Sequence, residues 1–152
     1  MKKLNLEILI HATPESVWDA VIDDAKYRQW SSAFQDGSYF EGGWNKGDAI
    51  RFIAINMEGQ KEGMVSEIAE NKYPEHISIR HLGFISNGIE DTTSEVVKKW
   101  APSYENYSLI RVEENKTLFK LDMDTTEGYY NMFMELWPKA LIKLKQVSEQ
   151  TL

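Results

Sequence analysis

The feature that most constrains the fold is a long apolar helix predicted near the C-terminus, from Tyr129 to Val147. Apolar side chains recur there at steps of three and four residues, which places them on one side of a helix. They form two adjacent stripes, the first made of Tyr129, Phe133, Leu136, Ala140, Leu144 and Val147 and the second of Tyr130, Met134, Trp137 and Leu141. This surface is wider than a helix lying on a solvated face needs. The helix therefore requires a concave sheet around it.

The rest of the chain is expected to supply that sheet. Residues 4–10 alternate in the pattern of a strand with one buried face. Thr13-Pro14-Glu15 then marks a helix start, and Asp23-Asp24 marks the start of a second short helix. Strands punctuated by glycine follow, and we predict them at Ser38–Glu41, Asp48–Asn56, Glu62–Glu70, His76–Leu82, Tyr104–Glu113 and Lys116–Thr125.

Residues 87–102 interrupt this strand pattern. Thr92 or Thr93 is expected to cap a short helix there, which carries Trp100 and ends at Pro102. The order is thus one strand, two short helices, about six strands and a long helix, with no internal repeat or linker. We therefore predict a single α+β domain spanning residues 1–152.

Composition excludes several classes of function. The 152 residues contain no cysteine, which rules out disulfides, thiolate metal sites and cysteine nucleophiles and is compatible with the cytosol. The net charge of −7 disfavours nucleic acid and anionic membrane surfaces as partners. No apolar window approaches the length of a membrane span. We therefore expect a cytoplasmic protein that binds neither nucleic acid nor membranes.

Four short motifs are more specific in their order along the chain than any is alone. They are Ala12-Thr-Pro-Glu-Ser-Val-Trp-Asp-Ala20 followed by Trp30, Gly42-Gly43-Trp44 with Gly47 and Asp48, Glu105-Asn106-Tyr107, and Trp137-Pro138-Lys-Ala-Leu-Ile-Lys-Leu144. With them the chain resembles the START-like helix-grip superfamily, also called SRPBCC. Within that superfamily it is most similar to the group named after the activator of the heat-shock-protein-ninety ATPase.

The resemblance implies a seven-stranded antiparallel sheet wrapped around a long C-terminal helix, with two short helices after the first strand. It also implies an apolar cavity, open at one end, as the ligand site. The superfamily contains lipid carriers, hormone receptors and polyketide cyclases, so fold analogy alone does not choose a function.

Signatures of catalysis are missing from the sequence. It has no nucleophile elbow, Walker loop, dinucleotide-binding glycine pattern or histidine–carboxylate metal motif, so we expect no cofactor and no metal. His76 and His81 are five residues apart on a predicted strand, which sends them to opposite faces. His81, in line with Ile77 and Ile79, is the only histidine expected on the concave side. The alternative is a hydrogen-bonded core histidine.

The candidate ligand site is therefore largely apolar. Side chains of the last strand are expected to face those of the long helix, Tyr107 and His81 would supply orienting hydrogen bonds, and Trp100 would close the mouth as a lid. The candidates are Phe52, His81, Trp100, Tyr107, Phe119, Leu121, Met123, Tyr130, Phe133, Met134 and Trp137. Such a mixture of aromatic, Met and Tyr side chains is typical of small-molecule sites and also of packed cores. Pro138 is expected to kink the helix beside them.

Three functions follow from these observations. The first is a protein that binds an apolar or aromatic small molecule. The second is a cyclase-like enzyme that uses the same cavity, with His81 and Tyr107 as its polar pair. The third is an interaction module that touches a chaperone, as the family name suggests, and an exposed apolar patch would support it.

Overall fold

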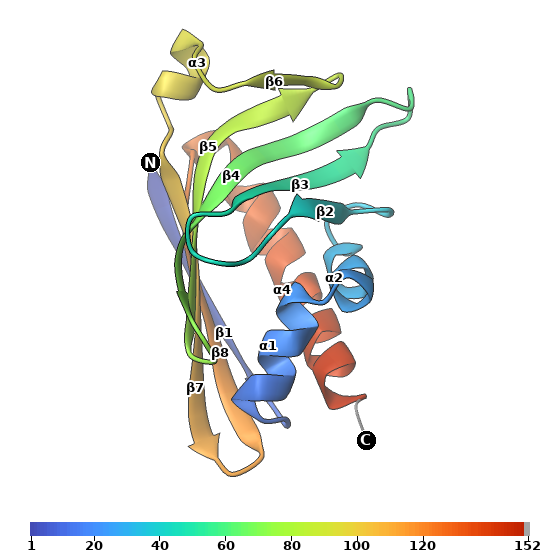
Figure 1. The fold of residues 1–152 in the computed structure, drawn as a ribbon, viewed down its shortest axis with the longest axis vertical. Coiled ribbons are helices and arrows are strands. Elements are labelled where there is room, and N and C mark those ends of the chain that lie inside the picture. Colours follow the sequence, from blue (N-terminus) through green and yellow to red (C-terminus); the bar gives the residue numbers. More distant parts are fainter. Residues whose placement is uncertain (151–152) are drawn as a thin grey trace.

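The computed structural model describes residues 1–150, in which an antiparallel sheet curves around a long C-terminal helix (Figure 1). Seven strands follow one another across the sheet in the order β1-β8-β7-β5-β4-β3-β2, and the short β6 pairs with β5. The strands are β1 Lys2–Ile10, β2 Tyr39–Gly42, β3 Ala49–Ile55, β4 Lys61–Lys72, β5 His76–Ser86, β6 Ile89–Asp91, β7 Ser103–Glu113 and β8 Lys116–Thr125.

Three of the four helices in residues 1–150, α1 (Pro14–Ile22), α2 (Asp24–Ser31) and α4 (Glu127–Glu149), cover the concave side of this sheet (Figure 1). The fourth is α3 Glu95–Lys98. Helix α4 packs against β1, α1 and α2, whereas the short α3 contacts β5 at the other end of the molecule (Figure 1). This arrangement confirms the predicted helix-grip α+β fold.

The segment between β5 and β7 departs from the prediction. Strand β5 continues past Leu82 to Ser86, and β6 makes the sheet eight-stranded rather than seven-stranded. A Cβ at position 83 would lie 2.1 Å from the carbonyl oxygen of Asp91, so glycine lets the returning chain cross β5 closely. The cap of α3 is Ser94 rather than Thr92 or Thr93, because the Asp91 carboxylate accepts the backbone N–H groups of residues 93 and 94 in a turn before the helix.

The main core lies between the concave face and the helices. Its fully buried members come from almost every strand and from α1 and α4, and they include Leu4, Val17, Val21, Ile50, Ile68, Ile77, Ile79, Phe119, Leu121 and Leu144. A second, smaller cluster of Ile53, Val65 and Ile85, with Tyr39 beside it, lies on the opposite face of the sheet. Each of the strands β2 to β5 contributes side chains to both clusters, so both faces of the sheet carry apolar side chains there.

The two threonine N-caps differ in a way that allows a matched test. The Thr13 hydroxyl accepts the backbone N–H of Ser16 at 3.2 Å, whereas Thr126, at the start of α4, makes no side-chain capping bond. We expect Thr13→Ala to lower the free energy of unfolding by about 1 kcal/mol. Thr126→Ala should cost only a few tenths of a kcal/mol. Urea denaturation of both variants checks this, and equal losses would contradict it.

Candidate ligand-binding site

A hydrogen-bonded polar cluster lies on the concave face of the sheet, where β4, β5 and β7 are neighbours. His81 pairs in register with Ser66 on one side and Ser103 on the other, and Glu105 follows two residues later on β7. Nδ1 of His81 lies 2.7 Å from the Ser66 hydroxyl, and its Nε2 lies 3.0 Å from Oε1 of Glu105. The Tyr107 hydroxyl donates to Oε2 of the same carboxylate. We call Ser66, His81, Glu105 and Tyr107 the polar cluster.

The polar cluster is almost entirely removed from water. The side chains of His81 and Glu105 are 7% and 14% exposed, and Tyr107 is buried. Burial raises the pKa of Tyr107 well above its ordinary value, and the negative charge of Glu105 raises it further. Tyr27 responds in the same way: burial raises its pKa, and Glu105 again adds to the rise. Both phenols therefore stay protonated and can donate hydrogen bonds across the neutral pH range.

Aromatic rings surround this cluster. The ring centroid of Phe52 lies 6.1 Å from those of both His81 and Tyr27, and Tyr107 lies 6.1 Å from Trp137. Trp44 packs against Phe52 at 5.7 Å. Within residues 1–150, the indole N–H of Trp44 is buried without a hydrogen-bond partner. Buried donors without a partner are rare in folded proteins, so this one is a candidate contact for a ligand or a bound water.

The predicted site residues fall into three groups. Five residues of the strands, together with Trp137 on α4, are buried: His81, Tyr107, Phe119, Leu121, Met123 and Trp137. Four others are half-buried: Phe52, Trp100, Tyr130 and Phe133. Met134 is 38% exposed and Tyr129 59%, so the predicted stripes are too wide over the first part of α4.

The reason for that exposure is the position of α1 and α2. These helices flank the middle and the C-terminal part of α4 (Figure 1). From α2 and the turn after it, Trp30 and Phe34 reach Trp137, and Lys143 bonds Ser32. Within residues 1–150, α1 and α2 do not extend along the first turns of α4 (Figure 1). The two predicted stripes would need partners on both sides to be buried over their whole length.

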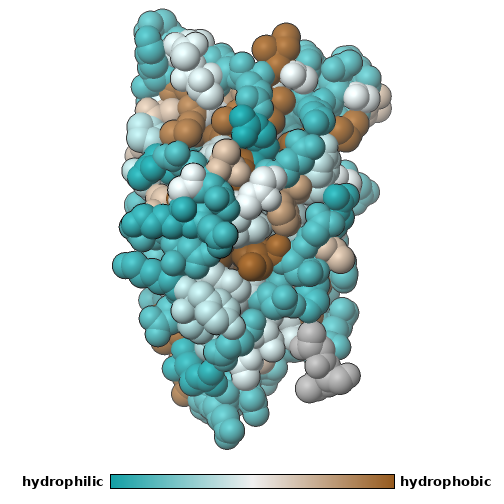
Figure 2. Space-filling view, viewed as in Figure 1, coloured by the Kyte–Doolittle hydropathy of each residue, from teal (hydrophilic) through white to brown (hydrophobic). Residues whose placement is uncertain are grey.

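The half-buried residues mark one end of the concave face as its accessible end. Trp100 stacks on Phe84 with ring centroids 6.4 Å apart, and Phe84 and Phe52 both pair in register with Met64. Hydrophobic residues on the viewed face are more frequent toward this end than toward the opposite one (Figure 2). Trp100 therefore lies against an aromatic side chain of β5, and it follows α3 rather than lying on that helix as predicted; its role as a lid stays a prediction.

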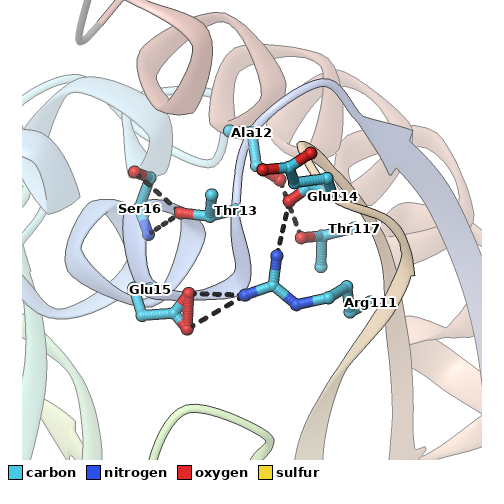
Figure 3. Close-up of polar contacts among 7 residues, drawn as sticks. All are labelled: Ala12, Thr13, Glu15, Ser16, Arg111, Glu114 and Thr117. Carbon is cyan, nitrogen blue, oxygen red and sulfur yellow. Dashed lines mark hydrogen bonds and ion pairs between the residues drawn. The ribbon is translucent and has the colours of Figure 1, made fainter.

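The opposite end is closed by polar contacts. Arg111 on β7 pairs with Glu15 at the start of α1 at 2.8 Å, and Thr117 donates to the carbonyl of Ala12 at 2.8 Å (Figure 3). The surface hollow at this end is lined by Pro14, Glu15, Pro74, Glu75, Leu109, Ile110 and Arg111. A second hollow is lined by Asn5, Leu6, Glu7, Ser108, Lys120, Leu121 and Asp122. Neither hollow contains a member of the polar cluster.

Sequence reasoning placed His81 and Tyr107 together but missed Glu105, Ser66 and Trp44. Glu105 had a readable signal, because it lies two residues before Tyr107 on one strand and must share its face. Ser66 had no such signal in the sequence, because a register shift between Val65 and Ser66 decides the orientation of its side chain. Trp44 lies in a loop between strands, so no periodicity reports its direction.

No group of three or more histidine, aspartate or glutamate side chains within residues 1–150 could hold a metal ion. No helix among the same residues is long and apolar enough to span a membrane.

The fold and this interior define the class: a helix-grip protein with a polar cluster under its helix. Among solved structures it is similar to the protein MLL2253 from Mesorhizobium loti, with a TM-score of 0.72 and 14% identity over 99% of this chain and 98% of that one. It is also similar to the Aha1 dimer from Colwellia psychrerythraea, with a TM-score of 0.69 and 19% identity over 99% and 98% of the two chains. DynU16 from the dynemicin biosynthetic locus has a TM-score of 0.71 and 14% identity, and this chain, matched over 99% of its length, covers 48% of it.

At these identities the similarity shows the fold alone. No family model matches the sequence, and no curated protein matches it.

Proposed function

We propose that this protein binds an apolar or aromatic small molecule on the concave face of its sheet. The observation that carries the proposal is the polar cluster beneath an aromatic wall. Small-molecule sites are built in this way, from an apolar lining with a few convergent polar groups that set the ligand's orientation. The ligand would enter at the end where Trp100 and Phe133 are half-buried.

The energetic cost of the cluster supports a functional role. Burying a carboxylate and an imidazole in an apolar core is unfavourable unless their hydrogen bonds are complete. An all-apolar interior would stabilise the same fold with less risk of an unpaired group. A buried polar cluster in which the pKa of Tyr107 is raised, near an indole N–H that has no hydrogen-bond partner within residues 1–150, is therefore a candidate recognition site.

A second candidate, a cyclase-like enzyme in the same site, is favoured by one observation. His81 lies on the concave face and is linked to Tyr107 through Glu105. Both ring nitrogens of His81 already have partners, so a substrate would have to displace Ser66 or Glu105 before His81 could exchange a proton with it. A ligand recovered in altered form after incubation with the protein would establish this function.

Membership of the ATPase-activator group and a cytoplasmic location remain predictions from the sequence. The corresponding role is contact with a chaperone, and its test is whether the purified protein changes the ATPase rate of a cognate chaperone. An unchanged rate would contradict this role and leave the binding and enzyme candidates.

Native mass spectrometry of freshly purified protein tests the binding proposal directly. We expect a native mass above the mass of the denatured polypeptide from the same sample by a few hundred daltons, as a drug-sized ligand would add. Fragmentation of the released molecule would then identify it. A bare polypeptide mass, together with no binding of aromatic probes, would contradict the proposal.

Phe133 provides a variant test with a neighbouring control. Phe133→Ala removes a half-buried ring near the proposed entrance, and we expect ligand affinity to fall about tenfold, or about 1.4 kcal/mol. The free energy of unfolding should fall by about 1–2 kcal/mol, less than for a fully buried Phe. Isothermal titration and urea denaturation measure the two effects.

Met132→Ala is the control, since Met132 is on the same turn and 42% exposed. It should change neither quantity measurably. Loss of stability without loss of affinity in Phe133→Ala would assign Phe133 to the core only.

A further inference from the structure

Glu105 is unusual among the acidic residues of this protein. Its side chain is 14% exposed, whereas every other acidic side chain that forms an ion pair within residues 1–150 is at least 24% exposed. Its only ion-pair partner among the same residues is His81. No lysine or arginine of that part of the chain therefore neutralises the carboxylate.

The charge of the polar cluster depends on the direction of the hydrogen bond between the Ser66 hydroxyl and Nδ1 of His81. If the Ser66 hydroxyl donates to Nδ1, His81 is a neutral imidazole whose Nε2–H donates to Glu105. Tyr107 donates to the remaining carboxylate oxygen. In this arrangement every donor is used and the cluster carries one unbalanced negative charge. A buried charge of this kind is costly unless a positive group lies against it.

The surroundings of Glu105 suit an organic cation better than a metal ion. The Glu105 carboxylate bonds Tyr107 and His81, and the ring of Phe52 lies 6.1 Å from that of His81. No metal-ligand cluster lies among residues 1–150. Phe52 contacts both His81 and Tyr27, and the negative charge of Glu105 acts on Tyr27 as well as on Tyr107. Aromatic faces attract cations, and they do so most strongly when water is excluded.

From this geometry we infer that the ligand carries a cationic nitrogen, an amine or a quaternary ammonium, which lies against the Glu105 carboxylate and beside the rings of Phe52 and Tyr107. The inference rests on the proposed function, because it names the chemical class of the molecule bound at the same site. It also assigns Glu105 as the residue that selects for charge.

The test compares two probes of the same shape. Benzyltrimethylammonium is a cation, and neopentylbenzene is its uncharged isostere, so any difference in affinity reports the charge. We expect the wild-type protein to bind the cation at least about tenfold more tightly, as measured by quenching of tryptophan fluorescence. Glu105→Gln should remove this preference while leaving the affinity for neopentylbenzene within about twofold.

Two further variants control for folding and for net charge. Glu114→Gln makes the same change at an exposed position on the β7–β8 turn and should leave the preference intact. Phe52→Leu keeps the bulk but removes an aromatic face, and it should reduce the preference for the cation. If Glu105→Gln does not fold, as judged by its melting curve, Phe52→Leu decides the question alone.

The possible results separate this inference from the proposed function. If neopentylbenzene binds as tightly as the cation, the inference is overturned and the binding function stands. If neither probe binds and the purified protein carries no small molecule, both fall. Side-chain ¹⁵N shifts that show a doubly protonated His81 at neutral pH would also overturn the inference, because the histidine would then supply the positive charge itself.

Discussion

Replacing Phe119 by alanine is expected to lower the free energy of unfolding by about 3–5 kcal/mol. Phe119 is 1% exposed on β8, faces the main core and packs against Tyr107 with ring centroids 5.4 Å apart. Its loss removes a large apolar surface and leaves a cavity between sheet and helix that neighbours on two rigid elements cannot fill. Because small domains are stable by about 5–15 kcal/mol, this single change would remove a major part of the total.

Urea denaturation followed by tryptophan fluorescence measures the effect of Phe119→Ala. The matched control is Ile110→Ala on β7, where the side chain is 44% exposed, and we expect a change within about 0.5 kcal/mol there. A cost below about 1 kcal/mol for Phe119→Ala would mean that the interior is loosely packed around this ring. That outcome would itself favour a cavity under the helix.

A comparable loss is expected when Gly42 is replaced by alanine. Gly42 has φ +110°, and a Cβ built there would lie 2.2 Å from the carbonyl oxygen of Ala49 on the paired strand β3. The Cβ is fixed in position by the backbone of residue 42 and the neighbouring atom is a backbone carbonyl oxygen, so no side-chain rotation can relieve the contact. The β2–β3 pairing must open locally, and we expect a cost of about 3 kcal/mol from strain and lost hydrogen bonds together.

Gly37→Ala separates the two sources of that cost. Gly37 also has a positive φ, +81°, but a Cβ there would meet no atom within 4 Å. Its replacement should cost only the conformational penalty of about 1–2 kcal/mol. The difference between the two variants therefore measures the steric clash at Gly42. Equal melting temperatures for the two would show that β2 is free to shift away from β3.

The fold itself was predictable because its signals are local. Period-two alternation in β1 and β8, and three-and-four spacing in α4, are properties of neighbouring residues and need no tertiary information. The Thr13 cap is confirmed for the same reason, and so is the Asp23 cap, whose side chain accepts the backbone N–H of Lys26. The segment after Ser86 was predicted less well, because β6 forms only when β5 is present to pair with it.

The residues of the candidate site were likewise predictable only where a local signal decides their position. His81 and Tyr107 were assigned to the concave face because strand periodicity decides the face of each residue. The assignment of Met134 to a cavity wall is not supported by its exposure, since helical spacing cannot say where neighbouring helices stop. Whether the interior is packed or open to a ligand depends on volumes that no pattern of residue types records.

The sequence by itself therefore determined the architecture: a curved antiparallel sheet, two short helices after the first strand and a long amphipathic helix in its grip. Only the tertiary structure decided that Ser66, His81, Glu105 and Tyr107 form one hydrogen-bonded cluster. These residues come from three strands, and their meeting depends on inter-strand register and on the register shift beside Ser66. Register is a relation between distant segments, and the packing of the whole sheet settles it.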